Sequence, residues 1–216
     1  MDQETDKTLT AREISRERHA RKLIEAAQDA ICAYGVRGAT IARIQEFSGL
    51  SRGMINARFD SKERLLEAAI RDMSAAYTGR WQRALAAAGD DPVSRLRALI
   101  RADFSPEVLN ERHVTLWFAF RAEAKPRDEY LSYITTREEP ITSIVTGLCV
   151  DLAEATGRGP DDGRRAATLL MAALEGFWAD FHLYPQDFDR DAAAQLAWDL
   201  LARFFPERIS GQITDA

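Results

Sequence analysis

The stretch from Thr40 to Lys62 constrains the fold more than any other part of this sequence, because it places a glycine between two short amphipathic segments. Thr40 is a favourable N-cap, since its hydroxyl can accept a hydrogen bond from a free backbone N–H in the following turn. Gly49 tolerates the left-handed backbone that ends a helix, and Ser51 is a second N-cap. Apolar residues recur at helical spacing in both segments: Ile41, Ile44 and Phe47 in the first, and Ile55 and Phe59 in the second. Two short helices that pack at an angle are therefore predicted.

The second of these helices is expected to present an outer surface. Burial of Ile55 and Phe59 leaves on that surface Arg52, Met54, Asn56, Ala57 and Arg58. In a DNA-binding helix-turn-helix, the corresponding surface enters the major groove. Asp60 and Ser61 then interrupt the pattern, and a third helix is expected to begin at Lys62. On spacing alone, an ordinary pair of short helices joined by a glycine turn explains these residues equally well.

The segment GATIARIQEFSGLSRGMINARFDSKERLL resembles the N-terminal domain of the TetR family of bacterial transcriptional regulators. The resemblance covers about the first 65 residues and keeps the family's spacing, although Asn56 stands where the family commonly has an aromatic residue. It implies phosphate contacts from Thr40, Arg43 and Lys62, since helix N-termini and cations bind anions. The full set of expected DNA-binding residues is Thr40, Arg43, Ser51, Arg52, Gly53, Met54, Asn56, Ala57, Arg58 and Lys62.

The distribution of charge agrees with a DNA-binding N-terminal region. The chain of 216 residues has a net charge of −5, which argues against a protein that coats nucleic acid along its whole surface. Residues 11–64 contain 11 Lys/Arg and 7 Asp/Glu, a net charge of +4, whereas the other residues together carry −9. The basic region therefore coincides with the predicted helix-turn-helix.

Composition predicts a soluble, cytoplasmic protein. The N-terminus lacks a hydrophobic signal core, and no apolar run approaches the 18 or so residues needed to span a membrane. Cys32 and Cys149 both lie in apolar helical patterns, so both are expected to be buried, reduced thiols.

Helical periodicity and breaks at proline or glycine continue through the rest of the chain, which predicts an all-α fold of about nine helices. Residues 1 to about 12 are expected to form a disordered tail or an arm whose Lys7, Arg12 and Arg16 touch DNA. The first helix should end at Gly35, and a long helix should run from Ser61 to Gly89. A sixth helix is expected after Pro106, and a seventh, kinked at Pro140, should end at Gly157.

The predicted domains are a helix-turn-helix DNA-binding domain at residues 1–62 and a ligand-binding and dimerisation domain at residues 63–216. The last two long helices are dense in alanine and glycine, which lets helices approach closely. In TetR-like proteins the last two long helices form the dimer interface. The resemblance therefore implies a homodimer that binds a palindromic DNA operator, most often as a repressor.

An enzyme is a remote alternative, because no catalytic set is legible. The three histidines, His19, His113 and His182, fall on three different predicted helices, and no HExxH or Cys-x-x-Cys motif accompanies them. Neither a metal ion nor another cofactor is therefore expected. A DNA-binding protein without any effector is a second alternative, but it would not need some 130 residues rich in Trp and Phe behind its helix-turn-helix.

Within the second domain, HVTLWFAFRAEA and LLMAALEGFWADFHL resemble the choline-responsive repressors of betaine synthesis, a subfamily of the TetR family. The resemblance implies a small effector, choline or a related quaternary amine, although aromatic residues at this spacing also suit a plain core. Arg121 would favour a hydrophobic or anionic effector unless an acidic residue neutralises it. The expected effector-binding residues are Tyr77, Trp81, Phe104, Trp117, Phe120, Arg121, Glu175 and Trp178.

Overall fold

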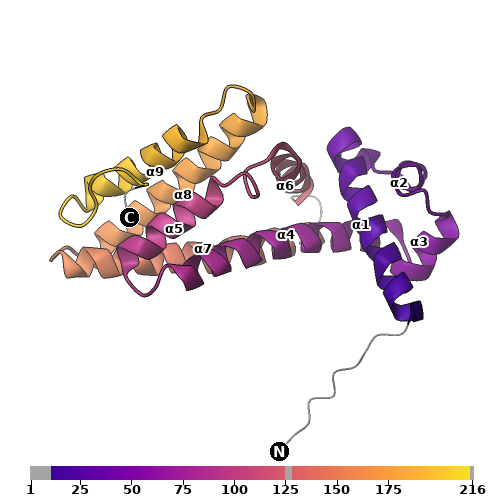
Figure 1. Cartoon of the computed structure of the whole chain (residues 1–216), viewed down its shortest axis with the longest axis horizontal. Helices are drawn as coiled ribbons and strands as arrows, with labels where there is room; N and C mark the ends of the chain where they lie inside the picture. The colour runs from indigo at the N-terminus through magenta and orange to yellow at the C-terminus, as the bar shows by residue number, and fades with distance from the viewer. Residues whose placement is uncertain (1–10, 125–127, 215–216) are drawn as a thin grey trace, which may run out of the picture. The chain divides into compact units, whose positions relative to one another are not determined.

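The structure, a computed structural model, describes residues 11–124 and 128–214, and over these residues the chain forms nine α-helices and no strand (Figure 1). The all-α prediction is confirmed. The helices are α1 (Ala11–Gly38), α2 (Ile41–Ser48), α3 (Arg52–Phe59), α4 (Lys62–Ala87), α5 (Pro92–Asp103), α6 (Glu111–Ala124), α7 (Asp128–Ala155), α8 (Pro160–Leu183) and α9 (Arg190–Phe204).

The chain divides into two compact units, Met1–Asp72 and Met73–Ala216, so that α4 contributes residues to both. The predicted domain limits of 1–62 and 63–216 coincide instead with the first residue of α4. Compactness does not show which residues bind DNA or ligand, so the functional division stays a prediction.

The first unit is organised by the predicted helix caps. The Thr40 hydroxyl accepts a hydrogen bond from the Arg43 backbone N–H at 3.4 Å, and the Ser51 hydroxyl accepts one from that of Met54 at 3.4 Å. Gly49 has a φ of 63° and donates its N–H to the carbonyl of Gln45 at 2.8 Å. These contacts fix where α2 ends and α3 begins. The core beneath them includes the fully buried side chains of Leu23, Ile31, Ile44, Ile55, Leu65 and Leu66.

Gly35 lies at a kink where the sequence predicts the end of the first helix: its φ of 70° and ψ of 170° are not helical, and the bounds of α1 join two helical stretches across it. Two other predictions for the first unit are corrected. Arg12 and Arg16 lie within α1 instead of on an arm, while Lys7 lies outside the described residues. Phe47 shares the predicted apolar spacing of α2 with Ile41 and Ile44, but it is 44% exposed. The buried residues of α2 are Ile44 and Ser48, and the Phe47 ring instead meets the exposed ring of Tyr34 edge-on, with the two ring centroids 6.4 Å apart.

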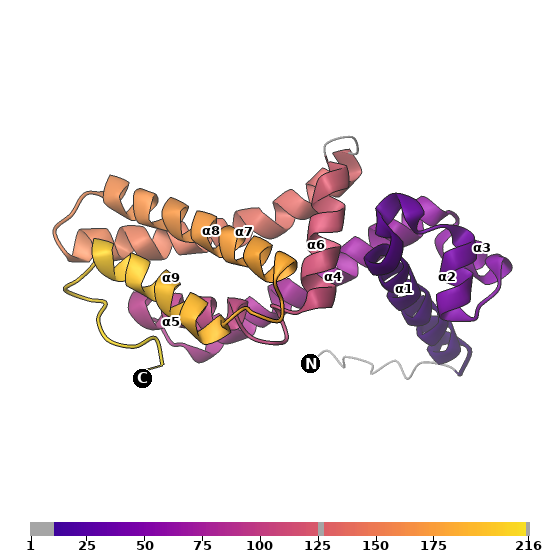
Figure 2. The ribbon, with the colours of Figure 1, turned by 90° about the horizontal axis from the view of Figure 1, so that it is seen from above.

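In the second unit, α7 and α8 lie side by side, α9 packs against α8, and α5 packs against α7 and α9 (Figure 2). Gly163 permits a close approach of α7 and α8. A Cβ at this position would lie 2.6 Å from the carbonyl oxygen of Cys149 and 2.6 Å from the Cα of Val150. Burial raises the pKa of the Cys149 thiol to about 12, so this thiol stays protonated. Cys32 is half-buried.

The sixth helix begins later than the sequence predicts. Residues 104–110 form turns, and α6 starts at Glu111 because the Asn110 side chain accepts a hydrogen bond from the backbone N–H of His113 at 2.9 Å. Val108 and Leu109 are nevertheless buried, so their apolar character reflects packing of a turn. Pro140 lies inside α7, as expected. Nowhere in the described part of the chain is a helix both long and apolar enough to cross a membrane.

Candidate DNA interface and ligand cavity

The outer surface of α3 is formed by residues that the core does not use. Ile55 is fully buried, whereas Arg52, Gly53, Met54, Asn56 and Ala57 are exposed and Arg58 is half-buried. Because the side chains of Arg52, Met54, Asn56 and Ala57 are exposed, they are accessible to base edges or phosphates. Their assignment to DNA binding stays a prediction.

The residues predicted to bind DNA phosphates differ in their exposure and in the contacts that they make within the first unit. Thr40 and Ser51 are exposed at the N-termini of α2 and α3, and Lys62 is half-buried at the start of α4. Arg43 is engaged within the unit, since its Nη1 donates to the Gly38 carbonyl at 2.7 Å and its guanidinium lies 3.9 Å from the ring centroid of Tyr34. These contacts hold the Arg43 side chain against the end of α1.

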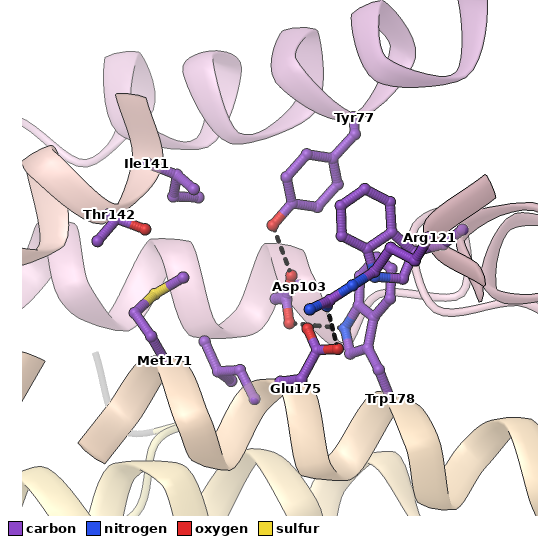
Figure 3. Close-up of a pocket in the computed structure, with 10 residues that line it drawn as sticks. Tyr77, Asp103, Arg121, Ile141, Thr142, Met171, Glu175 and Trp178 are labelled. Carbon is purple, nitrogen blue, oxygen red and sulfur yellow. Dashed lines mark hydrogen bonds and ion pairs between the residues drawn. The ribbon is translucent and has the colours of Figure 1, made fainter. Parts of the chain in front are cut away.

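A cavity of about 240 Å³ lies within the second unit (Figure 3). Side chains from α4, α5, α6, α7 and α8 form its wall, so residues far apart in sequence meet there. Its lining is Tyr77, Asp103, Trp117, Arg121, Ile141, Thr142, Met171, Leu174, Glu175 and Trp178.

A buried carboxylate ties three helices together at this cavity. Asp103 is only 7% exposed, and its two oxygens accept hydrogen bonds from the Tyr77 hydroxyl at 3.0 Å and the Trp178 indole N–H at 2.9 Å (Figure 3). Trp178 meets the rings of Tyr77 and Trp117 edge-on, at centroid distances of 5.9 and 6.3 Å. Hydrogen bonding of this kind offsets the cost of burying a carboxylate. The aromatic and acidic parts of the cavity are thus one connected network.

A second carboxylate, Glu175, forms an ion pair with Arg121 across the cavity (Figure 3). The side chains of these two residues are 43% and 38% exposed, so the pair lies closer to solvent than Asp103 does. The Arg121 guanidinium also lies 5.4 Å from the ring centroid of Trp117, within the range of a cation–π contact. Arg121 therefore faces the cavity, and the carboxylate of Glu175 neutralises its charge.

Five of the eight residues predicted to bind the effector line this cavity: Tyr77, Trp117, Arg121, Glu175 and Trp178. Trp81, Phe104 and Phe120 are buried side chains that do not belong to the lining, and Phe104 instead packs against Phe177 at 5.6 Å. Whether any of the eight binds an effector stays a prediction.

Sequence reasoning missed Asp103, together with Ile141, Thr142, Met171 and Leu174. A signal for Asp103 exists, because it continues the apolar face of α5 one turn after Leu99 and Ile100, both of which are buried. A carboxylate on an apolar helix face is the same feature that singles out Glu175 in the sequence.

Two of the three histidines, His113 and His182, lie against aromatic rings. The His113 ring lies 5.6 Å from Trp178 and 6.0 Å from Tyr77, while His182 stacks on Phe118 at 5.2 Å. Over residues 11–124 and 128–214, no group of three or more His, Cys, Asp or Glu side chains is placed to hold a metal ion.

Comparison with known proteins assigns both parts of the chain. Residues 23–69 match the bacterial regulatory proteins of the tetR family, and residues 92–206 match the C-terminal domain of BetI-type transcriptional repressors. The HTH-type transcriptional regulator BetI of Paraburkholderia phytofirmans is 33% identical over 188 residues, which are 86% of this chain and 93% of the relative. BetI of Burkholderia thailandensis is 31% identical over the same shares of the two chains.

Solved structures show the same fold. A proposed transcriptional regulator from Pseudomonas aeruginosa PAO1 superposes with a TM-score of 0.80 at 25% identity, covering 90% of this chain and 95% of the other. A transcriptional regulator from Rhodococcus has a TM-score of 0.73 at 17% identity, over 89% and 99% of the two chains. The chain therefore belongs to the TetR family of bacterial transcriptional regulators and carries a C-terminal domain of the BetI type.

Proposed function

We propose that this chain is a homodimeric transcriptional repressor that binds a palindromic operator and whose DNA affinity is controlled by a small organic cation in the cavity of the second unit. TetR-family regulators bind DNA operators and small-molecule effectors and act as dimers, and they are not enzymes. What the proposal adds is the repressor mode, the symmetry of the operator and the class of effector.

The charge of the cavity lining is the observation that carries the effector class. Two carboxylates, Asp103 and Glu175, and one guanidinium, Arg121, give the lining residues a formal net charge of −1. Three aromatic side chains, Tyr77, Trp117 and Trp178, stand beside these charges. A quaternary ammonium offers no hydrogen bonds, so aromatic faces and a nearby carboxylate are what recognise it.

The size of the cavity and the state of Arg121 refine this class. A volume of about 240 Å³ is below the roughly 300–1,000 Å³ of sites for drug-sized ligands, which favours a small metabolite. Arg121 by itself would favour an anionic effector, but its pairing with Glu175 leaves Asp103 as a further acidic group of the lining. A choline-like cation, implied by the resemblance of the second domain, therefore fits the lining better than an anion.

The dimer is proposed to form through α8 and α9. On α8, Leu169, Ala172, Gly176 and Leu183 are exposed at helical spacing, and on α9 Ala192 and Leu196 are exposed. Leu169, Leu183 and Leu196 are 48%, 67% and 57% exposed, so an apolar face with small residues lies on both helices. A two-fold related partner would bury it and set two helix-turn-helices about 34–36 Å apart along DNA, or a multiple of that spacing.

Reciprocal linkage tests the proposed function. Operator affinity is measured by footprinting of a palindrome near the gene, with and without choline or betaine aldehyde, and ligand affinity is measured by calorimetry, with and without the operator. If one ligand acts through one protein, both measurements must give the same coupling factor, typically 5–150-fold. A cavity variant, Trp117→Leu, is expected to lose ligand binding while retaining the operator.

Three results would contradict the proposal: a protein that stays monomeric at micromolar concentration, a protein that protects no palindrome, or a wild type that binds no organic cation at millimolar ligand. The first two concern the dimeric DNA reader. The third concerns the effector class alone.

A further inference from the structure

The guanidinium of Arg121 occupies the part of the cavity between Trp117 and Glu175. The Arg121 guanidinium lies 5.4 Å from the ring centroid of Trp117, and its Nη1 donates to Oε1 of Glu175. An aromatic ring with an adjacent carboxylate is the combination that recognises an organic cation. Arg121 comes from α6 and Glu175 from α8, so this contact also joins two helices of the cavity wall.

The contact between Arg121 and Glu175 is more exposed than the aromatic and acidic residues beside it. The Arg121 and Glu175 side chains are 38% and 43% exposed, whereas Asp103, Trp117 and Trp178 are at most 7% exposed. An ion pair this open to solvent is weakly held, because water screens it and solvates both groups when they separate. Separation of Arg121 from Glu175 breaks a contact that solvent already reaches, and it breaks neither of the hydrogen bonds that Asp103 accepts from Tyr77 and Trp178.

We infer that Arg121 is an internal competitor for the effector, and that a cationic ligand binds by displacing its guanidinium from Trp117 and Glu175. This inference rests on the proposed function, since it requires an organic cation in the cavity. It makes Arg121 a specificity-determining residue, because a ligand must bind the part of the cavity between Trp117 and Glu175 better than the guanidinium does. It also gives ligand entry a structural consequence, the loss of the ion pair that links α6 to α8.

The experiment is a calorimetric titration of the full-length protein with tetramethylammonium chloride at constant ionic strength. Removal of the competitor in Arg121→Gln is expected to tighten binding of this probe by about tenfold, the combined effect of one cation–π contact and one part-exposed ion pair. Arg121→Lys keeps a cation beside Glu175 and is expected to remain within about threefold of wild type.

Arg80→Gln is the matched control. The Arg80 side chain is 37% exposed, pairs with Glu107 at 3.2 Å in the same unit and does not line the cavity. Its replacement removes the same charge, so it reports the effect of net charge alone. Affinity for tetramethylammonium within about twofold of wild type is expected for this variant.

The outcomes separate the inference from the proposal beneath it. Tighter binding by Arg121→Gln with an unchanged Arg80→Gln supports the inference. Wild-type binding that is equal or stronger than that of Arg121→Gln overturns the inference and leaves a cationic effector standing. If no variant binds the probe and wild type instead binds acetate through Arg121, both the inference and the cationic effector are overturned.

Discussion

The two units differ in whether the residues that stabilise the fold are also the residues predicted to bind DNA or ligand. In the first unit, the groups that build the helix-turn-helix are backbone caps and two buried isoleucines, Ile44 and Ile55, while the predicted DNA-reading side chains of α3 point to solvent. In the second unit, the residues that line the cavity also hold the core together, since Asp103 receives hydrogen bonds from Tyr77 and Trp178.

This difference predicts how each unit can change. The exposed side chains of α3 can be replaced at little cost in stability, because surface substitutions usually change the free energy of unfolding by less than about 0.5 kcal/mol. A cavity built from core residues cannot vary in this way, because each change also removes a structural contact. Specificity for DNA is therefore expected to diverge more easily than specificity for the effector.

The largest effect is expected for Asp103→Ala. It leaves the Tyr77 hydroxyl and the Trp178 indole N–H without their shared buried acceptor, at a cost of about 1–3 kcal/mol for each donor. Urea unfolding should show a free energy of unfolding lower by roughly 2–6 kcal/mol, and ligand binding should be weaker.

Asp151→Ala, at an exposed position of α7, is the control for removal of an acidic residue and should leave stability unchanged. If Asp103→Ala lost ligand binding at full stability, folding and function would be as separable in the second unit as they are in the first.

A smaller effect, confined to DNA, is expected for the first unit. Arg52→Ala should change base preference by about 1–3 kcal/mol at one position of the operator. Lys62→Ala should weaken binding to all sequences similarly and reduce the slope of log affinity against log salt by about one. Neither variant should shift the urea midpoint, because Arg52 is exposed and Lys62 only half-buried. A uniform loss across all sequences from both variants would contradict the assignment of Arg52 to base reading.

The sequence predicts the first unit better than the second for a physical reason. Caps and turns are local: Thr40, Gly49 and Ser51 each act on a backbone group within four residues. The Asp103–Trp178 hydrogen bond joins residues 75 positions apart, and no local pattern specifies which α8 side chain meets the end of α5. The resemblance of the second domain to the betaine-synthesis repressors, with its aromatic and charged side chains, still placed five lining residues on the predicted list.

Helical spacing of apolar residues also mispredicted the start of α6, where a side-chain cap decides the first residue of the helix. Val108 and Leu109 have the apolar character of a helix face, yet the Asn110 side chain caps α6 after them and leaves them in a turn. The deciding contact, from the backbone N–H of His113 to the Asn110 side chain, involves no apolar residue, so the spacing of apolar residues does not predict it. At Gly35 the local rule holds, because the positive φ of this glycine interrupts α1 where the sequence predicts a helix end.

The smallest effect distinguishes the helix caps of the two units by their response to pH. The Ser61 hydroxyl accepts the Arg64 backbone N–H at the start of α4 at 3.2 Å, and the Asp91 carboxylate accepts the Ser94 backbone N–H at the start of α5 at 2.9 Å. Replacement of either cap by alanine should cost about 1 kcal/mol at neutral pH. The hydrogen bond from the Ser94 backbone, more than the nearby charge of Arg208, lowers the pKa of Asp91 below its ordinary value of 3.8.

Because the folded-state pKa of Asp91 is depressed, its contribution to stability is complete above about pH 3.8 and is lost as the pH falls through the lower, folded-state value. The difference between wild type and Asp91→Ala should therefore hold from pH 5 to about pH 3.8 and shrink as the pH falls further, whereas the Ser61→Ala difference should stay constant, since a hydroxyl does not titrate there. Urea unfolding of the three proteins at several pH values in this range measures both differences. If they decline in parallel, the loss arises from acid weakening of the whole fold, and the Asp91 cap has no pH response of its own.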